Sequence, residues 1–472
     1  MKIPILSGMY TTEAGDYRVA YPRNLVPVPT ATGMVSVGYL RPADGIKLFA
    51  TGPGIDRGGI RWNSQMYRVM GTKLVRIDAA GAVTILGDVG AGGLATMDYG
   101  FDRLAIWSGG RLYYWDGSTL VQVTDPDLGT VIDGRWIAGY YLSTEGNYII
   151  ATDLNDPYSI SPLKYGSAES DPDPILAIDE LRNEAYALGR YSIEVFQNIG
   201  GDNFPFQRIP GALVPRGVVG THAYCQYLSS FAFVGSNREE SIAVHLMTAG
   251  DSTKISTREV DMILASYPES VLAGIKVESR SDKAHQHLLI HLPDQTLVYD
   301  SAASTALSQQ VWFVVDSGIG VNSQYRARGL VWCYDKWLAG DPTSARIGEM
   351  TSDVSTHYGN VIGWEFSTQI VYNDGNGGII HELELVCLPG RVPLGVDPVV
   401  WASYSNDGAT WSQEKAKSCG KQGERDKRLA WRTQGVMNNW RIQRFRGTSE
   451  AHLSVARLEM AIEPLYTRPR NG

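Results

Sequence analysis

Hydrophobic and polar positions alternate along this chain in short runs that turn residues separate. Two apolar runs joined by a turn containing Gly or Asp recur as pairs, which predicts β-hairpins. The clearest pairs are "MYRVMGTKLVRID" (66–78), "RLAIWSGGRLYYWDG" (103–117), "GYYLSTEGNYIIATD" (139–153) and "AYALGRYSIEVFQ" (185–197). Weaker copies cover residues 231–246, 287–300 and 336–350. The pattern indicates a mainly β protein.

The spacing of these pairs indicates how the hairpins assemble. Their second strands begin roughly 36 to 55 residues apart, which is about one four-stranded propeller blade per repeat. A lone hairpin cannot bury both of its faces, whereas sheets packed around an axis cover one another. We therefore expect a six- or seven-bladed β-propeller over residues 61–355.

The segments on either side of the repeats have different patterns. Residues 1–60 are rich in Pro and Gly, as in "YPRNLVPVPTATG", and predict an extended N-terminal arm that wraps over a neighbour. Residues 356–472 contain at least five alternating segments separated by turns, which predicts an appended C-terminal β-sandwich-like domain.

One stretch of the C-terminal domain, "SYSNDGATWS" (403–412), resembles the Asp-box of sialidase-type propellers. Sialidases need several such boxes in successive blades, together with an arginine cluster and a tyrosine with a carboxylate partner. Only one box is visible, and "NDG" between two apolar runs is a strong hairpin signal. We expect Asp407 and Gly408 to form a structural turn.

Other candidate chemistry is equally weak. "FQRIP" (206–210) resembles a sialidase motif but falls in the middle of the chain. The strand "HQHLLIH" places His285, His287 and His291 on one face, where imidazoles could bind zinc, yet no Asp, Glu or Cys within the run completes the ligand set. Acidic pairs sit beside prolines in turns and predict solvated loops. These pairs are Asp125 with Asp127 and Asp171 with Asp173. We predict no catalytic, cofactor-binding or metal-binding residues, and no enzyme.

Composition and charge limit the function further. High Gly (51), Tyr (25) and Trp (12) with only 19% charged residues suit short strands and tight turns. The formal charge of −8 argues against simple electrostatic capture of nucleic acid. Basic residues nevertheless gather near the C-terminus, and we expect this basic cluster to face solvent or other subunits. Its members are Lys415, Lys417, Lys421, Arg425, Lys427, Arg428, Arg432, Arg441, Arg444 and Arg446.

Cysteine usage and hydropathy bear on the compartment. The cysteines Cys225, Cys333, Cys387 and Cys419 form no C-x-x-C pair, which favours a reducing compartment. Pro4 interrupts the apolar start of the chain, and there is no apolar run of about 18 residues. We expect neither a signal peptide nor insertion into a membrane.

A family resemblance takes the interpretation beyond the fold. Residues 263–304 resemble the tail hub, or nozzle, proteins of short-tailed bacteriophages, a family also described as packaged DNA stabilisation proteins. The most recognisable pieces are "SYPES" (266–270), "LLIHLP" (288–293), "LVYD" (297–300) and "QQVWFV" (309–314). "GYLRPADGIKLFATGPGIDRGGIRW" (38–62) looks like the opening of such proteins, and the C-terminal part departs from them.

The resemblance implies a structural role in the virion tail. Six copies would assemble below the portal and its adaptor ring, continue the DNA channel, help retain packaged DNA, and meet a tail needle or plug. Tailspikes or fibres would attach at the side, and double-stranded DNA would pass without sequence-specific binding. Synthesis and assembly would occur in the host bacterial cytoplasm. The alternative is a carbohydrate-binding or sialidase-like tail propeller that acts on host surface glycans, with exposed Tyr and Trp as stacking platforms.

Overall fold

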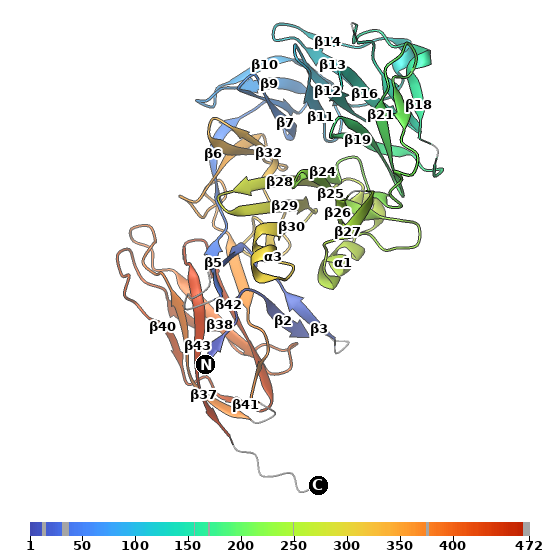
Figure 1. The fold of residues 1–472 in the computed structure, drawn as a ribbon. Coiled ribbons are helices and arrows are strands. Elements are labelled where there is room, and N and C mark those ends of the chain that lie inside the picture. Colours follow the sequence, from blue (N-terminus) through green and yellow to red (C-terminus); the bar gives the residue numbers. More distant parts are fainter. Residues whose placement is uncertain are drawn as a thin grey trace.

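The computed structural model describes residues 1–11, 16–30, 37–154, 156–168, 170–248, 250–373 and 377–465. A β-propeller lies at one end of the molecule and a β-sandwich at the other (Figure 1). The predicted fold class is therefore confirmed. Within the described residues the propeller has seven sheets of four or five antiparallel strands.

Each propeller sheet follows the one before it along the chain, except that one strand of the seventh comes from the N-terminal segment. Blade one contains β7 (Asp56–Trp62), β8 (Gln65–Met70), β9 (Lys73–Ile77) and β10 (Val83–Asp88). Blade two contains β11 (Thr96–Tyr99), β12 (Leu104–Ser108), β13 (Arg111–Trp115) and β14 (Leu120–Gln122). Blade three contains β15 (Asp133–Ile137), β16 (Tyr140–Glu145), β17 (Tyr148–Ala151) and β18 (Tyr165–Ser167). Blade four contains β19 (Ile175–Leu181), β20 (Glu184–Gly189), β21 (Ile193–Asn198) and β22 (Phe206–Arg208).

Among the described residues, the α-helices lie between blades five and six and within blade six. Blade five contains β23 (Gly217–Val218), β24 (Tyr224–Tyr227), β25 (Ser230–Ser236), β26 (Ala243–Thr248) and β27 (Asp251–Lys254). Blade six contains β28 (Lys276–Asp282), β29 (His285–His291), β30 (Thr296–Asp300) and β31 (Trp312–Val315). Blade seven contains β32 (Arg328–Cys333), β33 (Lys336–Gly340), β34 (Arg346–Thr351) and β6 (Gly45–Thr51). The helices are α1 (Arg258–Ala265), α2 (Glu269–Leu272), α3 (Ser301–Leu307) and the 3-10 turns η1 (Pro126–Leu128) and η2 (Pro162–Lys164).

Two-residue turns with positive φ join the first and second strands of several blades. Asn63 and Ser64 have φ of 47° and 61°, and Tyr334 and Asp335 have 57° and 56°. This left-handed geometry matches the right-handed twist of antiparallel strands, so the hairpins close tightly. It explains why the alternating runs of the sequence pair with their immediate neighbours.

The seventh blade is completed by β6, a strand from the N-terminal segment. β6 pairs antiparallel with β34, from Gly45 opposite Thr351 to Thr51 opposite Arg346. Ile46 is fully buried there, in a core cluster that also contains Phe313 of blade six. The pairing joins the first part of the propeller sequence to its last part and closes the ring of blades.

The sandwich also combines both ends of the described chain. One sheet contains β1 (Lys2–Ile3), β4 (Leu25–Pro29), β5 (Gly38–Pro42), β37 (Gly378–Cys387), β40 (Leu429–Arg432), β41 (Val436–Met437) and β43 (Val455–Pro464). The other contains β35 (Gly363–Ser367), β36 (Val371–Tyr372), β38 (Val399–Ser405), β39 (Lys415–Ser418) and β42 (Trp440–Thr448). Its core contains Leu25 and Leu40 together with Phe366 and Phe445.

The structure differs from the extended arm expected over residues 1–60. Apart from the hairpin of β2 (Gly8–Thr11) and β3 (Tyr17–Ala20), the described strands of this segment belong to the sandwich or to the propeller. β4 was not predicted as a strand because it contains Pro27 and Pro29, and proline interrupts a central strand. β4 lies at the edge of its sheet, where proline is tolerated.

A polar clamp fastens the two domains to each other. The Arg23 guanidinium forms an ion pair of 2.8 Å with Asp316, which follows blade six. The neighbouring Asn24 side chain donates to Asp316 (3.0 Å) and to the carbonyl of Gly363 in the sandwich (2.7 Å). Arg23 and Asp316 are 9% and 1% exposed, so these contacts are shielded from water and hold the domains in a fixed relation.

Candidate functional site

The axis of the propeller contains a cavity of about 570 Å³. Residues of all seven blades line it, from the inner strands β7, β11, β15, β19, β24, β28 and β32. Charged side chains from four of the blades reach this cavity, which makes it a candidate site for chemistry. They are Asp98, Arg135, Asp179, Glu180, Lys276 and Glu278.

Acidic side chains near this cavity connect three pairs of neighbouring blades. Asp98 of β11 accepts a hydrogen bond from the backbone N–H of Trp136 in β15 (2.8 Å). Asp133 of β15 accepts one from Ile178 in β19 (3.0 Å). Glu278 of β28 accepts from the N–H groups of Gly329 and Leu330 in β32, at 3.1 and 2.9 Å. These carboxylates accept hydrogen bonds from backbone N–H groups of the neighbouring blade, so their role is structural.

The charges around the axis are largely balanced within the chain. Arg135 donates to Asp179 over 2.9 Å. Burial raises the pKa of Asp133 to about 6, and the hydrogen bond from Thr96 counteracts that rise. The hydrophobic pattern of the sequence did not reveal these acidic residues of the inner strands. A single acid inside an otherwise apolar strand, as in "TMDY" (96–99), was the signal that could have revealed them.

The Asp-box-like stretch forms a turn, as the sequence predicted. β38 and β39 pair antiparallel on either side of it, and Gly408 has a φ of 77°. The Asp407 carboxylate accepts hydrogen bonds from the side chain and backbone N–H of Thr410, from the Ser405 hydroxyl and from the Ala409 N–H. These bonds hold the pKa of Asp407 below its ordinary value. The carboxylate is thus occupied by its own turn.

The other acidic and sialidase-like candidates do not come together. Arg208 of "FQRIP" lies on the outer strand of blade four and pairs with Glu194. Asp125 caps η1 by accepting from the Asp127 N–H (2.9 Å). Asp171 pairs with Arg238 (2.7 Å). Asp173 is buried rather than solvated and accepts from the Tyr191 N–H (2.6 Å), because the loop folds back over blade four.

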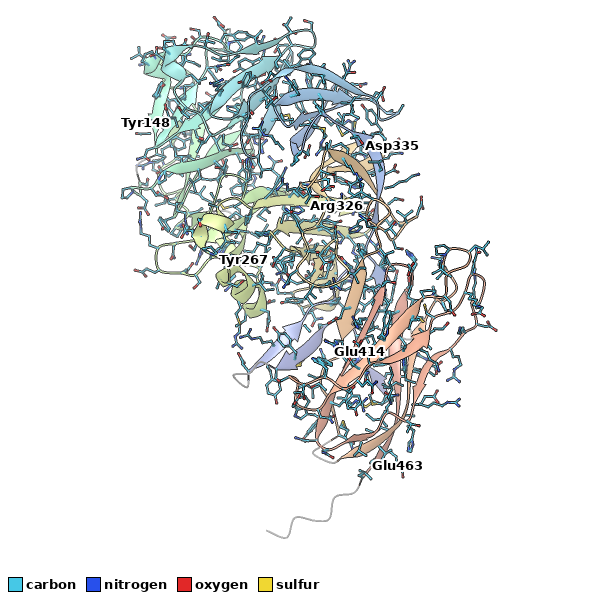
Figure 2. The ribbon with its side chains drawn as sticks, turned by 180° about the vertical axis from the view of Figure 1, so that it is seen from behind. Tyr148, Tyr267, Arg326, Asp335, Glu414 and Glu463 are labelled. Carbon is cyan, nitrogen blue, oxygen red and sulfur yellow. The ribbon has the colours of Figure 1, made fainter. Side chains whose placement is uncertain are left out.

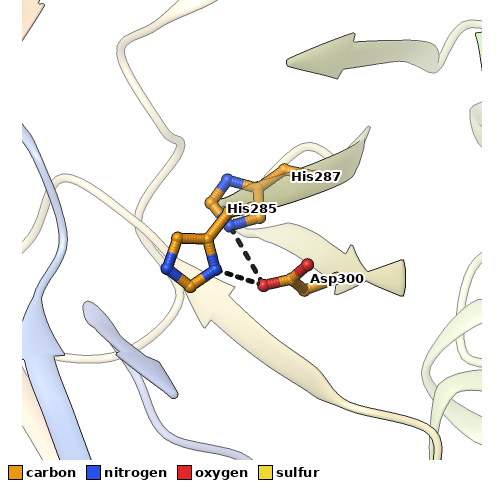
Figure 3. Close-up of side chains that lie close together, drawn as sticks. All are labelled: His285, His287 and Asp300. Carbon is orange, nitrogen blue, oxygen red and sulfur yellow. Dashed lines mark hydrogen bonds and ion pairs between the residues drawn. The ribbon is translucent and has the colours of Figure 1, made fainter. Parts of the chain in front are cut away.

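The three histidines of β29 contact two different acidic residues. His285 and His287 lie beside Asp300 of the neighbouring strand β30, as Figure 3 shows. His285 Nδ1 is 2.5 Å and His287 Nε2 is 3.6 Å from Asp300 Oδ2. His291 instead forms an ion pair of 2.6 Å with Glu278. Burial opposes ionisation of Asp300, but the hydrogen bond with His285 and the nearby His287 imidazole outweigh it and hold the pKa of Asp300 below its ordinary value.

Half of the ten residues of the basic cluster pair with acidic side chains of the sandwich. Arg428 pairs with Glu382 and Glu384 of β37, and Arg444 and Arg446 pair with Glu414, which Figure 2 labels on this domain. In the part of the chain that the structure describes, no ion pair involves the exposed residues Lys415, Lys417, Lys421 or Arg425, although Lys415 donates to the Thr433 carbonyl (2.9 Å).

Arg441 is the exception among the cations of the cluster, because it is fully buried. It donates to the Gln434 carbonyl (2.7 Å), and its guanidinium lies 3.5 Å from the centroid of the Tyr404 ring. Burial lowers its pKa to about 10. Arg441 therefore belongs to the core of the sandwich and presents no charge to a partner.

Each of the two domains matches a family of known proteins. Residues 1–355 match the family described as "Bacteriophage P22 Gp10, beta-propeller", and residues 363–463 match "Bacteriophage P22 Gp10, beta-sandwich". The chain belongs to the bacteriophage P22 Gp10 family. One relative is the "Tail hub protein gp10" of Salmonella phage P22, which is 28% identical over 381 residues and matches 76% of this chain and 78% of its own length. The resemblance found in the sequence is confirmed.

Solved structures give weaker likenesses outside the Gp10 family. The N-terminal domain of Nup159 is 11% identical, with 68% of this chain and 97% of that chain covered and a TM-score of 0.40. The Neurospora crassa Pan2 WD40 domain is 9% identical, with 66% and 96% covered and a TM-score of 0.40. These scores are too low to carry an argument.

Proposed function

We propose that this protein is a structural tail hub of a short-tailed bacteriophage and has no enzymatic role. One observation carries the proposal: both of its domains match, in order, the two domains of the P22 Gp10 family, whose Salmonella phage member is a tail hub protein. Its place would be the virion tail. The interdomain clamp of Arg23, Asn24 and Asp316 supports this role, because a hub must keep its binding faces in a fixed relation.

The finer features of the role are also part of this proposal. Six copies form a ring below the portal and its adaptor, continue the DNA channel and help to retain packaged DNA. The distal face meets a needle or plug, and tailspikes or fibres attach around the ring. A ring requires heterologous contacts that close at a set rotation. The protein is made and assembled in the cytoplasm of the host bacterium.

The charge distribution supports passage of DNA without capture. Non-specific affinity for a duplex grows with each phosphate that a free cation neutralises. The net charge is −8, and four of the arginines in the basic cluster pair with glutamates of the same chain. Four exposed cations of the cluster have no acidic partner among the described residues, and we assign the cluster to contacts with protein subunits.

No helix in the described ranges is long and apolar enough to cross a membrane.

Electron microscopy of the purified protein mixed with portal and adaptor tests the assignment. We expect six copies at the distal end of the adaptor, and phage lacking the protein should fill heads that then leak DNA. Three or twelve copies would contradict the ring, and failure to bind the connector would contradict the hub role. Turnover or tight binding of host glycans by the propeller would favour the carbohydrate alternative.

A further inference from the structure

Blade six contains a buried group of side chains with the chemistry of a metal site. His285 and His287 lie two residues apart on β29, and Asp300 ends the adjacent strand β30. One ligand atom from each of the three lies within 4.8 Å of the others, and all three residues are buried. We propose that His285, His287 and Asp300 bind a divalent transition metal ion, with zinc the best match. This inference goes beyond the proposed tail-hub role and does not depend on it.

The donor set fits zinc in type and in spacing. Zinc takes imidazole nitrogens and carboxylate oxygens at about 2.0–2.1 Å in a tetrahedron, so that neighbouring ligand atoms are about 3.3 Å apart. The 3.6 Å between His287 Nε2 and Asp300 Oδ2 is close to that separation. His285 Nδ1 and Asp300 Oδ2 are instead 2.5 Å apart, joined by a hydrogen bond with its proton between them. The metal would displace this proton, and the two atoms would move apart by about 0.8 Å.

His287 supplies an independent reason to expect a ligand. Its side chain is only 7% exposed, and its Nε2 has no hydrogen-bond partner among the described residues. The nearest acceptor is Asp300 Oδ2, and 3.6 Å is too long for a hydrogen bond. Figure 3 shows this nitrogen directed toward the carboxylate. A buried polar atom without a partner is costly, and a metal ion bound between the two groups would remove that cost.

Contacts around the group hold the carboxylate in position. Asp300 Oδ1 accepts from the N–H groups of Ala302 (3.1 Å) and Gln286 (3.2 Å), which directs Oδ2 toward the histidines. Such outer contacts orient the ligands in metal sites. Arg280, the nearest cation, is held by Asp44 (2.5 Å) and Asp282 (3.3 Å), so its charge is balanced.

A route to solvent is also present. His287 and Gln286 line a cavity of about 410 Å³ between blades four, five and six. An ion can enter through this opening, and a water molecule from it would complete the tetrahedron.

Metal titration of the full chain tests the proposal. The protein is stripped with a chelator and titrated with Co²⁺, whose visible absorption reports tetrahedral sites, and zinc is then added as competitor. We expect about one ion per chain. His287→Gln should reduce binding to near zero, because it removes the ligand atom Nε2, which has no hydrogen-bond partner among the described residues. His381→Gln is the control, since His381 is exposed and pairs with Glu463 on the sandwich.

The proposed site is wrong if His287→Gln binds the metal as well as the wild type does. It is also wrong if the wild-type protein takes up no ion at micromolar metal. X-ray absorption of the zinc-loaded wild type gives a reading that does not depend on any variant folding. Two imidazole nitrogens in the first shell support the proposal. A shell containing sulfur, or oxygen alone, contradicts it.

Discussion

Replacing Arg68 by Met should strongly destabilise the propeller. Arg68 is fully buried between blade one and blade seven, and it donates two hydrogen bonds to Asp56, at 2.6 and 2.8 Å. A third bond of 2.8 Å reaches the carbonyl of Gly329 in β32. The guanidinium therefore joins the first blade to the last across the point where the ring closes.

The magnitude follows from the charge that the substitution leaves behind. Arg68→Met strands the carboxylate of Asp56, which is 2% exposed, and breaking a buried ion pair on one side costs about 3–5 kcal/mol. A propeller of about 300 residues unfolds with an entropy of about 0.6 kcal/mol/K, so the melting temperature should fall by about 5–8 °C.

Differential scanning calorimetry of the purified variant measures this fall. Arg238→Met is the matched control, because Arg238 is half exposed and pairs with Asp171 at the surface, and its melting temperature should equal that of wild type. Adding Asp56→Asn to Arg68→Met removes the stranded charge and should restore part of the loss. An Arg68→Met protein that melts within about 1 °C of wild type would refute the reasoning.

Three further outcomes can be checked. Asp407→Ala should lower the unfolding midpoint of the sandwich, because it removes the hydrogen bonds that hold the turn. Sialoside hydrolysis should stay at background in both proteins. If the wild type hydrolyses sialosides and the variant does not, the assignment of Asp407 to a structural turn is wrong. Burial lowers the pKa of His245 from 6.5 to about 4, so its contribution to stability is complete above about pH 6.5 and is lost as the pH falls toward 4. His245→Phe should reduce the slope of the unfolding free energy against pH over that range, measured by urea unfolding, by up to about 1.4 kcal/mol per pH unit. Equal slopes for the wild type and the variant would contradict this. Charge reversal at Arg425, Lys427 and Arg428 should impair tail assembly in a reconstitution assay; tight duplex binding at about 0.15 M salt that these changes abolish would make the cluster a DNA site.

Local features of the fold could be predicted from the sequence. The hairpin at Asp407 and Gly408 was predicted because Asn, Asp and Gly favour positive φ and the runs on both sides alternate. The blades were predicted because each consists mainly of strands that are neighbours along the chain. Turns such as Tyr334 and Asp335 gave no glycine signal, yet the neighbouring strands still fix their geometry.

Long-range pairing could not be predicted. β6 completes a sheet whose other strands lie almost 300 residues further along, and a seven-residue run carries no mark of so distant a partner. The same limit applies to the candidate sites. His285 and His287 were placed correctly on one face, but Asp300 comes from another strand. Arg428 and Arg446 looked like free cations because their glutamate partners lie 44 and 32 residues away.

The pairing of the chain's two ends restricts how this protein can fold during its synthesis. Ile3 lies opposite Leu458 in the sandwich, so a ribosome adding about 5–20 residues per second needs roughly 25–90 s to produce both partners. β4 and β5 pair with each other, but β5 must wait for Val455 before it joins the rest of its sheet. Until then these strands carry unpaired N–H and C=O groups that could bind the same strands of another nascent chain. Polysomes bring such nascent chains close together, so a chaperone that covers the first 50 residues would have most effect there.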